Sequence, residues 1–313
     1  MSLLDRRLLF VTGKGGVGKT TIASALSLMA AKQGKKTLVC EVDAKGNLSD
    51  FFGTQPLRFA PTVVQKNLSA MAMDTEESLK EYLRLQLKVP LLTRLGPLAK
   101  TFDFVATAAP GVKEILTVGK LCYEVRERNY DLVVVDASAT GHVVGQLGSP
   151  VALSELVRVG VVRQQTEWMT DLLTDKAVTG VVIVATPEEM PVSETLDLVT
   201  RLEGETDIDI AMVVANRVLP ELFADREREL FDRLTMPQHR AKLAELVGPS
   251  VDAVLDGADL AVRLRRARAK HLERLGSELP QSIPLINVPF VFSKSHGIRT
   301  TRHVADRLSE ELL

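Results

Sequence analysis

Short apolar runs alternate with longer stretches of helical pattern along much of the chain. Six runs have the length of buried strands, and they are 7–13, 36–43, 130–138, 179–186, 208–218 and 283–292. The stretch Thr21 to Gln33 between the first two runs has a helical pattern, and Gly34 follows it at the position of a helix C-cap. Strands that alternate with helices indicate a parallel sheet covered on both faces. The sequence therefore predicts a doubly wound, mostly parallel α/β fold.

Between 53 and 129 this alternation is replaced by helical segments. Helical patterns occupy 74–89, 111–129, 220–278 and 299–313. The first two of these segments are separated by prolines at Pro90, Pro97 and Pro110. We therefore expect a single domain over 1–313, with a helical insertion at about 53–129.

The composition is that of a globular chain, with 45% apolar and 25% charged residues among 313. The 39 Lys and Arg against 40 Asp and Glu leave a net charge of −1, so no basic excess favours nucleic acid or an anionic membrane as the main partner. Cys40 and Cys122 are too far apart for a CxxC motif. We find no signal peptide and no apolar run of about 18 residues, and we expect a cytoplasmic chain without stable membrane insertion.

A glycine-rich loop, GKGGVGKTT, follows the first apolar run. It contains the pattern G-x-x-x-x-G-K-[ST] of a phosphate-binding loop, with a strand before it and a helix after it. Glycines let backbone N–H groups point at phosphate oxygens, and the helix N-terminus adds partial positive charge. Lys19 would neutralise the β- and γ-phosphates, and Thr20 would ligate Mg²⁺. We expect ATP or ADP along the loop, at Gly13, Lys14, Gly15, Gly16, Val17, Gly18, Lys19, Thr20 and Thr21.

Polar side chains end three of the predicted strands. Asp136 ends LVVVD, where a carboxylate at the carboxyl edge of the sheet can hold the water shell of Mg²⁺. Asp43 ends TLVCEVD and is suited to orient or deprotonate the attacking water, although a helix cap or an ion pair would also explain it. Asn216 ends AMVVAN, and its amide suits the edge of adenine or, almost equally well, a turn.

Seven segments follow one another in an order that is typical of one protein family. They are KGGVGKTT, EVDAKGNLSDFFG, APGVKEIL, VVVDASATGH, VATPEEMPVSETLDLVTRL, VVANRV and PLINVP. In this order they resemble the ArsA/Get family of P-loop ATPases, which includes arsenite-pump ATPases and targeting factors for tail-anchored membrane proteins. The resemblance implies an ATP-hydrolysing, nucleotide-gated dimer. It implies that Lys14 is the signature lysine, that Asp43 lies in the first switch and 136–142 in the second, and that Asn216 and Pro289 contact adenine.

The chain also departs from the family pattern. Asp43 is followed by Ala-Lys-Gly instead of Pro-Ala-His, and the second switch keeps its Asp, Thr, Gly and His around an altered centre. Two cysteines cannot supply the three thiolates that an arsenite site needs, so we do not expect activation by metalloids. The zinc-binding CxxC of the eukaryotic targeting factors is also missing from the sequence.

Three functions remain open on the sequence. The favoured one is an ATPase that opens and closes a homodimer, or a heterodimer with a paralogous ATPase, to handle a client such as an apolar helix. A positioning ATPase of the MinD/ParA type is disfavoured, because the C-terminal segment RHVADRLSEELL ends acidic. The third is a weakly catalytic regulatory subunit of a heterodimer, which the altered first switch keeps open.

Three features have both a functional and a structural interpretation. Lys14 would reach across a dimer to the partner's phosphates, which makes Lys14, Lys19 and Asp43 the expected catalytic residues; alternatively, Lys14 only supports its own loop. The basic segment 262–275 contacts a partner or nucleotide, or is a solvated helix face. The apolar segment 85–105 forms a client groove or packs on the sheet.

Overall fold

A single sheet of eight strands organises the computed structural model, which describes residues 2–43, 46–87, 111–156, 161–293 and 297–312. The strand order is β3-β4-β2-β5-β1-β6-β7-β8. Every neighbouring pair is parallel except β3 with β4. The bounds are β1 Leu8–Gly13, β2 Thr37–Glu41, β3 Thr62–Gln65, β4 Leu68–Ala72, β5 Leu132–Ala139, β6 Thr179–Ala185, β7 Ile210–Val218 and β8 Leu285–Pro289.

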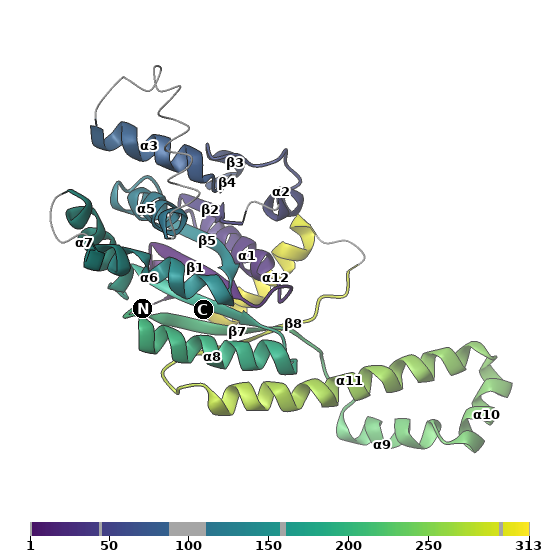
Figure 1. Cartoon of the computed structure of the whole chain (residues 1–313). Coiled ribbons are helices and arrows are strands. Elements are labelled where there is room, and N and C mark those ends of the chain that lie inside the picture. Colours follow the sequence, from purple (N-terminus) through teal and green to yellow (C-terminus); the bar gives the residue numbers. More distant parts are fainter. Residues whose placement is uncertain (1, 44–45, 88–110, 157–160, 294–296, 313) are drawn as a thin grey trace.

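Helices cover both faces of this sheet (Figure 1). Helices α1 and α12 pack on one face, and α5, α6, α7 and α8 pack on the other. The α-helix bounds are α1 Lys19–Lys32, α2 Asn47–Phe52, α3 Thr75–Leu87, α5 Val112–Arg126, α6 Thr140–Leu156, α7 Val161–Thr174, α8 Glu189–Glu205, α9 Asp225–Leu234, α10 Pro237–Val247, α11 Ser250–Glu278 and α12 Ile298–Leu312. A short 3-10 helix, Leu3–Asp5, precedes β1.

The central strands are apolar on both sides because both of their faces are buried. In β1, Leu8 and Phe10 face the core under α5–α8, whereas Leu9 and Val11 face the core under α1 and α12. Alternate side chains of a strand point to opposite faces, so a strand between two helical layers reads as a continuous apolar run. All six predicted strands are present, and the doubly wound α/β fold is confirmed.

The range 53–129 is not purely helical, and that part of the sequence interpretation is wrong. It contains β3 and β4 before α3 and α5, and these two strands extend the sheet at one end. β3 is short, half-exposed and antiparallel, so it lacks the apolar run that marks the central strands. The three prolines at 90, 97 and 110, and most of the apolar segment 85–105, lie outside the described residues.

Helices α9, α10 and the first part of α11 project from the body of the molecule (Figure 1). We call residues 225–267 the helical arm. It lies beyond the sheet edge at which β7 ends, and its only buried apolar side chains are Phe231 and Leu255. The last part of α11 returns along α8 and buries Leu275 in the core. None of the described helices combines the length and the apolar character that crossing a bilayer requires.

Candidate functional site

The glycine-rich loop leaves the carboxyl end of β1, the strand that lies between β5 and β6. Gly13, Gly16 and Gly18 have φ angles of 146°, 86° and 99°, which L side chains rarely adopt. A Cβ atom at Gly13 would lie 2.1 Å from the carbonyl oxygen of Val184, and one at Gly18 would lie 2.3 Å from Nδ2 of Asn216. Both conformation and close approach therefore require glycine at the two ends of the loop.

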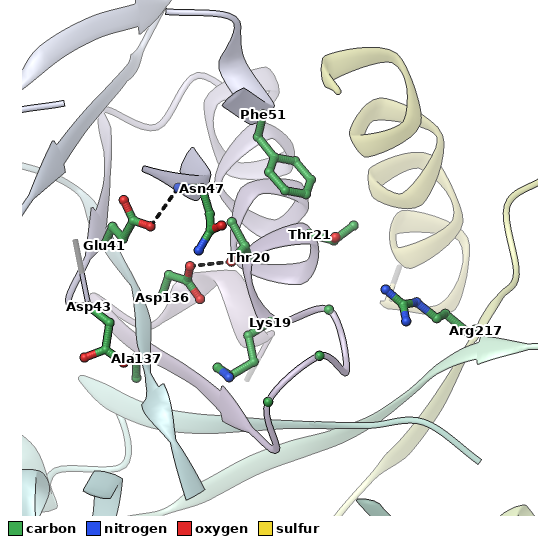
Figure 2. Close-up of a pocket in the computed structure, with 13 residues that line it drawn as sticks. Lys19, Thr20, Thr21, Glu41, Asp43, Asn47, Phe51, Asp136, Ala137 and Arg217 are labelled. Atoms are coloured by element: carbon green, nitrogen blue, oxygen red, sulfur yellow. Dashed lines mark hydrogen bonds between the residues drawn. The ribbon is translucent and has the colours of Figure 1, made fainter. Parts of the chain in front are cut away.

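A cavity of about 410 Å³ opens between this loop and the ends of β2 and β5 (Figure 2). This volume lies within the range of small-molecule sites. Its lining residues are Gly15, Gly16, Gly18, Lys19, Thr20, Thr21, Glu41, Asp43, Asn47, Phe51, Asp136, Ala137 and Arg217. The structure thus brings most of the predicted loop residues together with Asp43 and Asp136, which come from two other strands.

Asp136 is a buried carboxylate with one oxygen unsatisfied. The Oγ1 of Thr20 donates a hydrogen bond of 2.6 Å to Oδ2 of Asp136, while Oδ1 is buried without a hydrogen-bond partner. Burial raises the pKa of Asp136 to about 6; the Thr20 hydroxyl and Lys19 act against this rise, and Glu41 and Asp43 add to it. Since buried polar atoms normally have partners, the free oxygen beside a hydroxyl fits a hydrated cation.

Glu41, at the end of β2, is a lining residue that the sequence interpretation missed. It is 2% exposed, its Oε1 accepts a hydrogen bond of 3.0 Å from the backbone N–H of Asn47, and its Oε2 is buried without a partner. An acidic residue inside the apolar run TLVCEV was the available signal. Asp43 follows two residues later and is exposed at the same cavity (Figure 2).

Lys14 does not line the cavity, because it is held on its own chain. Its ammonium forms an ion pair with Oε1 of Glu194 in α8, and both side chains are about one-third exposed. The Oγ1 of Thr140, the first residue of α6, donates a hydrogen bond of 3.3 Å to the other oxygen of Glu194. The Nζ of Lys19 donates to the carbonyl oxygen of Lys14 at 3.3 Å. The carboxylate of Glu194 thus links the loop after β1, the start of α6 after β5, and α8 after β6, and these three strands are neighbours in the sheet.

The family model for anion-transporting ATPases matches this chain over residues 6–164 and 159–244. The chain belongs to this family. The predicted resemblance is therefore confirmed, and membership implies ATP as the nucleotide.

Relatives of this chain come from distant organisms. ATPase BagA of Mycobacterium tuberculosis is 33% identical over 225 residues, which are 68% of this chain and 66% of that protein. ATPase ASNA1 homolog 2 of Paramecium tetraurelia is 32% identical over 276 residues, which cover 75% and 80% of the two chains. ATPase get3 of Schizosaccharomyces japonicus is 35% identical over 150 residues, with 47% and 45% covered. The match thus spans slightly less than two-thirds of the mycobacterial relative.

The contacts of Asn216 and Pro289 with adenine stay a prediction, and the structure places both residues outside the lining of the cavity beside the glycine-rich loop. Asn216 is 5% exposed; its Nδ2 donates to the carbonyl oxygen of Val17 at 2.8 Å, and its Oδ1 accepts from the backbone N–H of Arg217 at 2.9 Å. Asn216 therefore supports the glycine-rich loop through its hydrogen bond to the backbone of Val17. Neither Asn216 nor Pro289 at the end of β8 lines the cavity, whereas Arg217, with a φ of 58°, does. That Arg217 lines the cavity depends on its backbone conformation near the end of β7, which the sequence does not predict.

The metal-binding capacity of the described residues is limited. They contain no group of three or more His, Cys, Asp or Glu side chains that could hold a metal ion. Mg²⁺ usually keeps several waters and binds through one or two carboxylates together with substrate phosphates, so Thr20 and Asp136 are a sufficient protein contribution. Cys40 and Cys122 are buried, and burial raises the pKa of both thiols.

A second cavity, of about 450 Å³, lies between α3, α5, α6 and α7. Most of its lining is apolar or aromatic; the residues include Leu79, Tyr82, Leu85, Ile115, Leu116, Leu153, Trp168 and Met169. Lys120 also lines it and is paired with Glu81 at 2.7 Å and with Glu124 at 2.6 Å. The cavity adjoins neither the glycine-rich loop nor Asp136, so its chemistry is separate from that of the nucleotide site.

Proposed function

We propose that this chain binds ATP with Mg²⁺ in the cavity beside the glycine-rich loop and hydrolyses it within a dimer. The observation that carries the proposal is the hydrogen bond between Thr20 and the buried carboxylate of Asp136, next to a loop whose backbone requires its glycines. A hydroxyl, an incompletely satisfied carboxylate and a phosphate-binding loop in one cavity are the parts that phosphoryl transfer needs.

The chain's own residues would bind and orient the nucleotide. Loop N–H groups and the N-terminus of α1 would hold the phosphates, and Lys19 would neutralise their charge. Thr20 and Asp136 would hold Mg²⁺, which when bound adds positive charge to the β- and γ-phosphates. This is consistent with the unsatisfied oxygen of Asp136.

Asp43 is our candidate for positioning the attacking water. It lines the cavity from the exposed side, where water has access, whereas Glu41 and Asp136 are almost fully buried. A carboxylate in this position can accept a hydrogen bond from water in line with the γ-phosphate.

Lys14 would act across the dimer. Its ion pair with Glu194 is partly exposed, and such pairs contribute only about 0–1 kcal/mol, so a γ-phosphate of higher charge can displace Glu194. A lysine supplied by each chain to its partner's nucleotide would favour the closed dimer with ATP and release it after hydrolysis.

Complementation between two inactive variants tests this proposal. Lys14→Ala and Asp43→Asn should each bind ATP and lose most turnover. Mixed dimers should regain part of it, because one of their two sites keeps both the incoming lysine and the acid. Mixed dimers that form but stay inactive would mean that Lys14 does not act in trans.

We further propose that the dimer handles an apolar client at the second cavity. The apolar lining favours a hydrophobic helix as the client. A fluorescent apolar helix should bind the wild-type chain, and Leu79→Asp should weaken its binding at least tenfold. Leu230→Asp, on the exposed surface of α9, is the matched control and should bind as the wild type does. Equal binding by all three proteins would contradict this client site.

A further inference from the structure

A row of small and apolar side chains runs along the exposed surface of α11 in the helical arm. The row consists of Ala253, Gly257, Leu260, Leu264 and Ala267, all of them exposed. Leu260 is 55% exposed and Leu264 is 43% exposed. The steps between them alternate between four and three residues, which is the spacing of the core positions of a coiled coil. We call these five residues the heptad row.

Other parts of α11 already have neighbours in the same chain. Arg240 of α10 donates to Asp256 at 2.7 and 2.9 Å, and Leu255 is buried in the arm. Near its C-terminus, α11 packs on α8. Water is a poor environment for a continuous apolar row on a 29-residue helix, so the heptad row has the character of a surface for another helix.

We propose that the heptad row pairs in antiparallel orientation with the heptad row of a second copy of this chain. A two-fold axis between Leu260 and Leu264 sets Leu260 of each copy against Leu264 of the other. The same register sets Gly257 against Ala267 and Ala253 against His271. In each of these pairs an a position of one coiled-coil helix faces a d position of the other. A two-fold interface has to be self-complementary in this way.

Charge favours the antiparallel direction. The acidic side chains at the tip of α11 are Asp252, Asp256 and Asp259, and no basic residue lies among them. The basic side chains nearer the body are Arg263, Arg265, Arg266, Arg268 and Lys270, without an acid among them. Antiparallel pairing sets each acidic segment beside a basic one, with Asp256 near Lys270 of the second copy, whereas parallel pairing would set like charges together.

The position of the arm indicates why a second copy fits. Arg268 donates a hydrogen bond of 2.9 Å to Glu188, which precedes α8 at the sheet edge that carries the glycine-rich loop. From residue 268 to the proposed axis is about 9 Å along α11, so the two copies of residue 268 would lie about 18 Å apart along the paired helices. The inference therefore rests on the dimer of the proposed function and assigns it a second contact, outside the nucleotide.

Cysteine pairing tests the register. Chains with Ala253→Cys and chains with His271→Cys should form a disulfide-linked dimer when mixed under mild oxidation, and neither should do so alone, because only antiparallel pairing brings these two positions together. The native thiols of Cys40 and Cys122 are buried and give little background. Disulfides formed by either chain alone would indicate parallel pairing and would overturn the proposal, as would a mixture that forms none.

Charged substitutions test the energetic contribution. Leu260→Asp with Leu264→Asp should raise the dissociation constant of the dimer at least tenfold by analytical ultracentrifugation. The matched control is Leu246→Asp with Val247→Asp, which changes two exposed apolar residues of α10 outside the row and should leave the constant unchanged. Equal self-association of all three proteins would overturn the proposal.

Failure of this inference can be told apart from failure of the proposed function. A chain that turns over ATP and dimerises, but gives no mixed disulfide, keeps the function and removes the heptad row from the interface. A chain that gives the mixed disulfide but does not hydrolyse ATP supports the row and refutes the function. A chain that stays monomeric at all concentrations, with and without ATP, would overturn the proposal, since its partner would then be a different protein.

Discussion

At the residue scale, Asp43 differs from the other acids of the nucleotide cavity by being exposed. Asp43→Asn keeps the size of the side chain and removes its charge. We expect ATP turnover to fall roughly 100-fold, because asparagine cannot accept a proton from water, while nucleotide affinity stays near that of the wild type. Steady-state turnover and binding of a fluorescent nucleotide measure the two effects. Asp50→Asn on α2 is the control, and equal losses of binding and turnover would indicate a structural role for Asp43.

Glu194 controls where the side chain of Lys14 lies. Glu194→Gln keeps an acceptor for Thr140 and removes the charge that holds Lys14. Because a partly exposed pair is worth at most about 1 kcal/mol, the ATP concentration for half-maximal dimer closure should fall by up to about fivefold. Light scattering during an ATP titration measures the shift.

A second ion pair on the same helix provides the control for Glu194. Glu205→Gln breaks the exposed pair with Arg201, far along α8, and should leave dimer closure unchanged. If both variants close as the wild type does, Glu194 has no hold on Lys14. If the double variant Lys14→Ala with Glu194→Gln closes more readily than Lys14→Ala alone, Glu194 acts through another group.

Sequence was informative at this scale wherever the chemistry is local. Gly13, Gly18, Lys19 and Thr20 lie within one short segment of the chain, and Asp136 directly follows the apolar run LVVV of its own strand. The pairing of Lys14 with Glu194 and the support of Val17 by Asn216 join segments 180 and 199 residues apart. Such contacts depend on strand order, which local patterns do not specify.

At the scale of elements, α5 contains a buried lysine that organises the second cavity. Lys120 is 7% exposed and pairs with Glu124, also 7% exposed, and with Glu81. Lys120→Ala would leave the buried carboxylate of Glu124 without its counter-ion, with only the hydrogen bond of 2.8 Å from Nδ2 of Asn129 remaining. We therefore expect the free energy of unfolding to fall by about 3 kcal/mol in urea titrations.

Lys80 in α3 is the matched control for Lys120. It also pairs with two glutamates, Glu76 and Glu77, but all three side chains are well exposed. Lys80→Ala should change the free energy of unfolding by no more than about 0.5 kcal/mol. Similar losses for the two variants would mean that the burial of Lys120 does not determine its contribution.

Elements were predictable in proportion to their burial. The strands β1, β5 and β6 are covered on both faces and stand out as apolar runs, whereas β3 is an exposed edge strand with little pattern. The helices of the arm were expected from their periodicity. Their projection from the body was not, since a helix pattern does not say what a helix packs against.

At the scale of the whole molecule, stability should depend on pH through Asp136. The pKa of its carboxyl is about 6 in the folded chain against 3.8 ordinarily, so the folded state favours the protonated form. The stabilisation is complete below about pH 4 and is lost as the pH rises through 6, at a cost of about 3 kcal/mol. Without nucleotide and Mg²⁺, Asp136→Asn should therefore be more stable than the wild type at pH 8. Its advantage over the wild type should be smaller at pH 5.

Urea titrations at the two pH values measure this difference. Asp207→Asn changes an exposed carboxylate and should show no such dependence. A variant Asp136→Asn whose advantage is the same at pH 5 and pH 8 would mean that Asp136 does not titrate in this range.

The strand order also has a consequence for biosynthesis. β1 is made first, yet its neighbours β5 and β6 are completed only at residues 139 and 185, and Gly13 lies against Val184. At ribosomal rates of about 5–20 residues per second, roughly ten to forty seconds pass before the neighbours of β1 exist. The segment that contains β1, with the apolar side chains of residues 8–11, therefore emerges long before it can be covered. We expect this interval to be when the chain depends most on chaperones.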